Sequence, residues 1–143
     1  MRTLILYSTK SGACRECAEM LAREIKDTTV FDLKEKVPDI TEFDIVIMGS
    51  GIRMGGAYKP FKKFLKENEN ILLKKDIAFF ITNMQTDKFE KIIENNIPEK
   101  LRGAAFCIKT FGGKVPFGGK KDDREWMLMD EVNAFVRAVK EKM

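Results

Sequence analysis

Short and almost wholly apolar runs recur along the chain, separated by polar or amphipathic stretches. Continuous apolar runs of this length are typical of strands that are covered on both faces. The stretches between them place apolar residues three and four positions apart, which predicts amphipathic helices. The predicted strands span residues 3–7, 28–32, 44–49, 77–81 and 104–108, and the predicted helices cover 13–26, a segment from Pro60, a segment around Phe89 and Ile92, and a last segment from about Asp123.

This alternation of strands and helices predicts one α/β domain over residues 1–143, with a parallel five-stranded sheet and helices on both faces. The segment 34–43 contains Pro38 and is too short for a full helix, so we expect a turn or a short helical piece there. Polar or glycine-rich loops follow the first and third strands. The strand order 2-1-3-4-5 would place these loops side by side at the carboxyl edge of the sheet, where such folds bind ligands.

Composition excludes several classes of function. The 143 residues contain no histidine, which removes Ser-His-Asp triads, His-paired cysteine nucleophiles and His-liganded metal sites. No apolar run approaches the roughly 20 residues of a transmembrane helix, and we expect neither a membrane span nor a signal peptide. The three cysteines do not form a disulfide framework and indicate a reducing cytoplasm. The net charge of +4 does not indicate nucleic-acid binding and favours acidic partners.

The loop after the first strand is the clearest candidate for an anion site. It lies before a predicted helix, whose free amides and dipole both favour a negative charge. It lacks the Gly-Lys-Ser/Thr ending of a Walker A loop, and an ordinary helix-capping turn is the alternative interpretation. The loop reads Ser8, Thr9, Lys10, Ser11, Gly12, Ala13 and Cys14.

Two segments together resemble the flavodoxin family. Residues 4–12 are similar to its opening strand and phosphate loop, and residues 43–50 are similar to its third strand. The continuation Gly49-Ser50-Gly51-Ile52-Arg53-Met54-Gly55 is most similar to the branch that includes menaquinone-dependent protoporphyrinogen dehydrogenases. The resemblance covers nearly the whole chain and implies the flavodoxin-like fold.

The resemblance also implies a non-covalently bound FMN. The first loop, Ser8 to Cys14, would hold the phosphate. The second loop would lie along one side of the flavin ring, and the residues after the fourth strand along the other. A peptide near Gly55 would turn so that its carbonyl accepts a hydrogen bond from reduced flavin N5. The ring-side residues are Ser50, Gly51, Ile52, Arg53, Met54 and Gly55 on one side and Asn83, Met84 and Gln85 on the other.

The chain departs from the family pattern in three ways. Cys14 replaces the usual threonine of the phosphate loop, and a thiol is a weaker donor than a hydroxyl. Met54 and Met84 stand where carrier flavodoxins stack aromatic rings, with Tyr58 as a possible substitute. The chain is also basic, whereas carriers of this family are usually acidic. The basic charge and the methionines point to the dehydrogenase-like branch or to a variant carrier.

Three functions therefore compete. The first is an FMN-containing electron carrier between protein partners, for which the basic charge favours partners with acidic surfaces. The second is a flavoenzyme that oxidises a porphyrinogen and reduces a quinone. We rank the carrier first, narrowly, because the glycine-rich segment 112–121 offers little surface for a large tetrapyrrole. The third is a thiol–disulfide oxidoreductase that uses Cys14 and Cys17, since a helix N-terminus lowers the pKa of a leading thiol.

Overall fold

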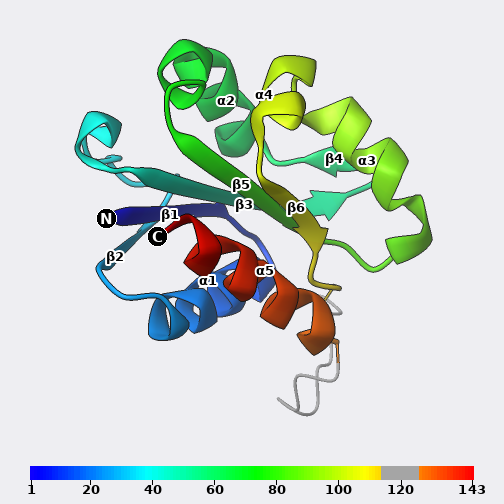
Figure 1. Ribbon diagram of the computed structural model, residues 1–143. Helices are drawn as coiled ribbons and strands as arrows, with labels where there is room; N and C mark the ends of the chain where they lie inside the picture. Colours follow the sequence, from blue (N-terminus) through cyan, green and yellow to red (C-terminus); the bar gives the residue numbers. More distant parts are fainter. Residues whose placement is uncertain (114–125) are drawn as a thin grey trace.

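The computed structural model describes residues 1–113 and 126–143, and its centre is a parallel sheet in the order β2-β1-β3-β5-β6 (Figure 1). The two-residue strand β4 (Gly56–Ala57) lies off this path and pairs antiparallel with β3. Counting only the five parallel strands along the chain, the order is the predicted 2-1-3-4-5. The parallel strands are β1 (Thr3–Ser8), β2 (Thr28–Asp32), β3 (Ile45–Arg53), β5 (Asp76–Thr82) and β6 (Cys107–Thr110).

Helices cover both faces of the sheet, as predicted. The helices α1 (Ala13–Glu24) and α5 (Met129–Lys142) lie on one face (Figure 1). The other face carries α2 (Lys59–Leu72), α3 (Phe89–Asn96) and α4 (Glu99–Ala104). Side chains of a strand alternate between the two faces, so the apolar run of β1 feeds two cores. Ile5 and Tyr7 pack with α1 and α5, whereas Leu4 and Leu6 pack with α2 and α4.

Two predicted boundaries are wrong. The glycine-rich segment that begins at Ser50 was expected to be a loop, but β3 continues through it to Arg53 and stays paired with β5 as far as Gly51 and Thr82. Near the other edge, residue 104 ends α4 instead of beginning the last strand, which starts at Cys107. The Ala105 amide still donates to the Leu101 carbonyl and so closes α4, while Ala105 itself is already extended and leads the chain toward β6.

Smaller differences concern the ends of the helices. The first helix stops at Glu24, and Ile25 follows in extended conformation. The expected short helical piece between residues 34 and 43 is a 3-10 turn, Ile40–Glu42. The last helix begins at Met129, and the expected start at Asp123 lies outside the described residues, as does most of the glycine-rich segment 112–121. None of the described helices is both long and apolar enough to cross a bilayer.

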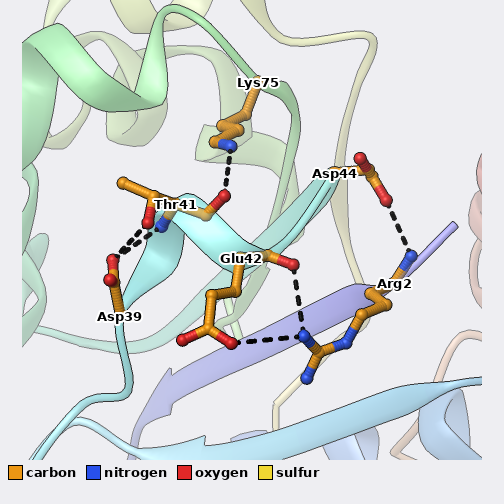
Figure 2. Close-up of polar contacts among 6 residues, drawn as sticks. All are labelled: Arg2, Asp39, Thr41, Glu42, Asp44 and Lys75. Carbon is orange, nitrogen blue, oxygen red and sulfur yellow. Dashed lines mark hydrogen bonds and ion pairs between the residues drawn. The ribbon is translucent and has the colours of Figure 1, made fainter.

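Polar contacts tie together the amino ends of β1, β3 and β5, opposite to the edge where ligands are expected (Figure 2). The Arg2 amide donates to the Asp44 carboxylate at 2.9 Å, and Lys75 Nζ donates to the Thr41 carbonyl at 3.1 Å. The Asp39 carboxylate accepts from both the amide and the hydroxyl of Thr41, which lowers its pKa. These exposed contacts leave the carboxyl edge of the sheet free for a site.

Candidate functional site

A cavity of about 370 Å³ opens at the carboxyl ends of β1, β3 and β5, and we call it the loop cavity. Its position is where the strand order reverses, because β1 and β3 are neighbours although β2 lies between them in sequence. Three loops and the start of two helices supply its walls. They contribute Lys10, Ser11, Ala13, Gly51, Ile52, Arg53, Tyr58, Thr82, Asn83, Met84 and Gly113.

The loop between β1 and α1 is held by its own hydroxyl groups. Thr9 Oγ1 accepts from the Gly12 amide at 3.0 Å, and Ser11 Oγ accepts from the Ala13 amide at 3.3 Å. Gly12 has a φ of 90°, a left-handed conformation that suits glycine and that lets the chain turn into the helix. The first amides of α1 have no partner within the helix and lie at the cavity wall formed by Ser11 and Ala13. Helix starts of this kind are places where proteins bind anions, and the phosphate site here stays a prediction.

The Cys14 thiol does not face the loop cavity. Its side chain is fully buried, and its Sγ lies 3.2 Å from Thr82 Oγ1 at the end of β5. Burial raises the pKa of Cys14 to about 12, and the contact with Thr82 offsets only part of that rise. The expectation that the helix N-terminus lowers this pKa is therefore wrong. Cys17, one turn later, is also buried in the core beneath α1.

The segment after β3 is a tight hairpin, which we call the β3–β4 hairpin. Arg53 pairs with Gly56, so only Met54 and Gly55 form the turn. Their φ values of 54° and 80° identify a type I′ turn, which requires positive φ at both positions. Met54 is 98% exposed at the tip. The hairpin carries Ile52 and Arg53 into the wall of the loop cavity.

Tyr58 supplies an aromatic face to the loop cavity. Its ring lies over Gly51, where a Cβ atom would come within 2.8 Å of the ring. The Tyr58 amide donates to Ser50 Oγ at 3.3 Å, and the buried Ser50 hydroxyl donates to the Gly51 carbonyl. Lys10 Nζ lies 5.1 Å from the centre of the Tyr58 ring. Ser50 therefore acts by fixing Tyr58, and the aromatic wall comes from Tyr58 instead of from Met54.

The third wall follows β5 and is stiffened by side-chain hydrogen bonds. Asn83 Nδ2 donates to the Gln85 carbonyl at 2.6 Å, and Asn83 Oδ1 accepts from the Thr110 hydroxyl at 2.6 Å. The Asn83 side chain is thus engaged in holding the loop between β5 and α3 against the end of β6. Met84, 62% exposed, is left facing the opening.

A second cavity of about 630 Å³ adjoins the first, and we call it the hairpin cavity. The two cavities share Ile52, Arg53, Asn83 and Met84 as lining residues. Beyond them, the hairpin cavity lies between the β3–β4 hairpin and α3. Lys88 and Lys91 add two exposed ammonium groups to the Arg53 guanidinium, and no acidic residue lines this cavity among the described residues.

The predicted site residues thus fall into four groups. The loop cavity alone is lined by Lys10, Ser11, Ala13 and Gly51, and the four shared residues line both cavities. The hairpin cavity alone is lined by Met54, Gly55 and Gln85. A fourth group supports these walls without lining either cavity: Ser8, Thr9, Gly12, Cys14 and Ser50. Sequence reasoning missed Thr82, Gly113, Lys88 and Lys91. The lysines carry no distinguishing signal in a chain so rich in lysine.

Comparison with known proteins identifies relatives of this chain. The family model for the flavodoxin domain matches residues 4–117. Protoporphyrinogen IX dehydrogenase (quinone) of Escherichia coli K12 is 35% identical over 98 residues, which are 64% of this chain and 53% of that protein. The protein of the same name from Leishmania major is 28% identical over 96 residues, covering 63% and 42% respectively. The chain thus spans about half the length of the curated relatives it matches.

Solved structures agree at the level of the fold. A Fusobacterium nucleatum flavodoxin bound to flavin mononucleotide superposes with a TM-score of 0.66 at 13% identity, covering 100% of this chain and 99% of that one. A Lactobacillus acidophilus flavoprotein in complex with FMN gives 0.63 at 21% identity, covering 76% and 92%. Because the family model covers most of the chain and the fold agrees, this protein belongs to the flavodoxin-domain family.

Proposed function

We propose that this chain binds FMN non-covalently in the loop cavity and functions as a redox protein. The observation that carries the proposal is the combination of an anion-binding helix start with a cavity whose walls are apolar and aromatic. Lys10, Ser11 and the first amides of α1 would hold the phosphate. Ile52 and Tyr58 on one side and Met84 on the other would contact the ring. Bound FMN would accept and donate electrons, and the protein sets its binding and orientation.

FMN titration tests this proposal. The purified protein should retain flavin absorption through gel filtration after incubation with FMN. Replacing Thr9 and Ser11 together by alanine removes two hydroxyls that hold the phosphate loop, each of which accepts a hydrogen bond from a loop amide and can still donate its own proton to a phosphate. Hydrogen bonds to charged groups contribute about 1.5–3 kcal/mol each, so we expect affinity to fall by a factor on the order of 10²–10⁴. Thr41→Ala, at the opposite edge of the sheet, is the control. Unchanged affinity in the double variant would place the phosphate elsewhere.

For the physiological role, we propose oxidation of an acidic small molecule with transfer of the electrons to a quinone. Two observations support this role above the carrier that the sequence alone favoured. The hairpin cavity adjoins the proposed flavin site and is lined by Arg53, Lys88 and Lys91. The curated relatives are protoporphyrinogen IX dehydrogenases (quinone). Cationic groups beside an apolar opening would recognise carboxylates on an otherwise apolar substrate.

Turnover of protoporphyrinogen with a menaquinone analogue tests this role. The double variant Lys88→Gln, Lys91→Gln should raise KM by roughly twofold to thirtyfold, since each exposed charge contact contributes about 0.2–1 kcal/mol. Affinity for FMN should stay unchanged, because neither lysine lines the loop cavity. Lys140→Gln, on the exposed face of α5, is the matched control. Robust turnover with an unchanged KM in the double variant would mean that the substrate binds outside the hairpin cavity.

An electron carrier is the second candidate, favoured by the fully exposed Met54 at the hairpin tip and by the open cavity mouth. A carrier would reduce or oxidise a protein partner while failing to oxidise small acidic substrates. Because the chain carries a net charge of +4, complex formation with an acidic partner should weaken as salt is added. For either role we propose a reducing, cytoplasmic location, consistent with an odd number of cysteines, three in the chain.

A further inference from the structure

Asn96 makes an unusual set of contacts for a buried asparagine. It is the last residue of α3 and only 7% exposed. Its Nδ2 donates to the Gly55 carbonyl at 2.9 Å and to the Ile92 carbonyl at 2.8 Å. Its Oδ1 accepts from the Ala57 amide at 2.9 Å. One side chain thus joins helix α3 to the β3–β4 hairpin, about 40 residues earlier in the chain.

These contacts act on the outer edge of the hairpin. Arg53 and Gly56 close the type I′ turn, so the Ala57 amide and the Gly55 carbonyl are not needed for pairing with β3. The Asn96 carboxamide binds both and spans Gly56, as a neighbouring strand would. A hairpin with a two-residue partner strand has few other contacts to fix its position. The hydrogen bonds of the Asn96 side chain, which we call the clamp, therefore determine where the turn lies relative to α3.

The hairpin that Asn96 holds borders both cavities. Arg53 lines both cavities, whereas Met54 and Gly55 line the hairpin cavity. Reduction of FMN changes N5 from a hydrogen-bond acceptor to an N–H donor, so a backbone carbonyl nearby favours the reduced form and an amide the oxidised form. The Gly55 carbonyl is engaged by Asn96 and can reorient only after that bond breaks. Glycine at 55 would otherwise allow this movement readily.

We propose that Asn96 is a positioning residue that holds the β3–β4 hairpin in one conformation and so limits how much the protein prefers reduced over oxidised FMN. The inference rests on the proposed FMN binding. Asn96 acts indirectly, through its hydrogen bonds to Gly55 and Ala57. It needs no contact of its own with the walls of the loop cavity. Asn96 restricts the movement of the hairpin, and its role does not depend on a direct contact with the flavin.

Two variants test the clamp in the FMN-free protein. Asn96→Ala removes all three hydrogen bonds, and Asn96→Leu removes them while keeping the branching and the number of heavy atoms of the side chain. The Ala57 amide should exchange with solvent deuterium about tenfold faster in both, the factor that corresponds to 1.4 kcal/mol. Asn70→Ala, an exposed asparagine in the last turn of α2, is the control. An unchanged exchange rate at Ala57 in both variants would overturn the clamp whether or not FMN binds.

The second measurement compares dissociation constants for oxidised and reduced FMN. Neither variant changes the charge of the protein, so a change in the ratio reports on hydrogen bonding. We expect the ratio to shift by about tenfold toward reduced FMN, with a smaller change in affinity for the oxidised form. Faster exchange with an unchanged ratio would overturn the positioning role. If the wild-type chain binds no FMN, the proposed function and the flavin part of this inference both fail, while amide exchange still decides the clamp.

Discussion

The Cys14 thiol should be almost inert in the folded protein, which separates a flavin protein from a thiol oxidoreductase. Its pKa is raised to about 12 by burial. At pH 8 about one Cys14 in ten thousand would be ionised, against about a quarter of ordinary thiols with a pKa near 8.5. Since the thiolate is the reacting species, alkylation should be slower by about three orders of magnitude. Complete burial of the sulfur should slow it further.

Iodoacetamide labelling followed by mass spectrometry can measure this for each cysteine. Trypsin cleaves after Arg15, so Cys14 and Cys17 fall on separate peptides, and Cys107 falls on a third. Cys107 is only half-buried and serves as the internal reference, although burial raises its pKa as well. We expect Cys107 to react first and the other two to react only after denaturation. In concentrated guanidinium all three should react at similar rates.

Rapid native labelling of Cys14 would refute this reasoning, because neither its burial nor its raised pKa allows it. Formation of a disulfide between Cys14 and Cys17 under mild oxidation would refute it equally. It would also require α1 to open, since both residues belong to the core beneath that helix. Thiol chemistry would then become the leading function. Slow labelling together with flavin retention would leave only the two flavin roles.

Further predictions concern stability, measured by urea unfolding. Gly49→Ala should lower the free energy of unfolding by about 1–3 kcal/mol, because its Cβ would lie 2.2 Å from the fully buried Phe80 ring. Gly103→Ala in α4, which has open space around it, should raise the free energy of unfolding by up to about 1 kcal/mol. Gly55→Ala should cost about 1–2 kcal/mol because φ is 80°, and Gly55→Asn should cost less. The Cys14 thiol ionises near pH 9 in the unfolded chain and only near pH 12 in the folded protein. Between these values the free energy of unfolding should fall as pH rises, by at most about 1.4 kcal/mol per pH unit. In Cys14→Ala that part of the slope should disappear.

The strands and the hydroxyl-rich loop after β1 could be predicted from the sequence because each has a local signal, whereas the strand order was favoured by the chemistry of the loops. Continuous apolar runs mark strands that are buried on both faces, and Figure 1 shows helices on both sides of them. The hydroxyl-rich loop stands directly between such a run and an amphipathic helix. A glycine-rich segment carries no such local signal. Gly51 suggested a loop after the predicted strand 44–49, yet β3 continues through it. A glycine is needed at this position because the Tyr58 ring occupies the space of a side chain there, as the Phe80 ring does at Gly49.

The chemistry of Cys14 could not be predicted, because it depends on residues far away in sequence. A helix N-terminus lowers the pKa of an exposed thiol. Here the side chain lies against Thr82, which is 68 positions later, and is covered completely. Asn96 likewise gives no sign in the sequence of its contacts with Gly55 and Ala57. In both cases a polar side chain is engaged by a segment that only the fold brings close.

The choice between the two flavin roles depends on what enters the hairpin cavity. Arg53 and Met84 line both cavities, so a molecule in the hairpin cavity would lie against the same walls as the proposed flavin ring. Lys88 and Lys91 face that space from the α3 side without an acidic partner among the lining residues, which makes it a favourable place for carboxylates. A carrier needs no such space, because it exchanges electrons with a partner protein without binding a small substrate. Loss of substrate affinity in the Lys88 and Lys91 variants, with flavin affinity retained, would therefore identify the hairpin cavity as a substrate site.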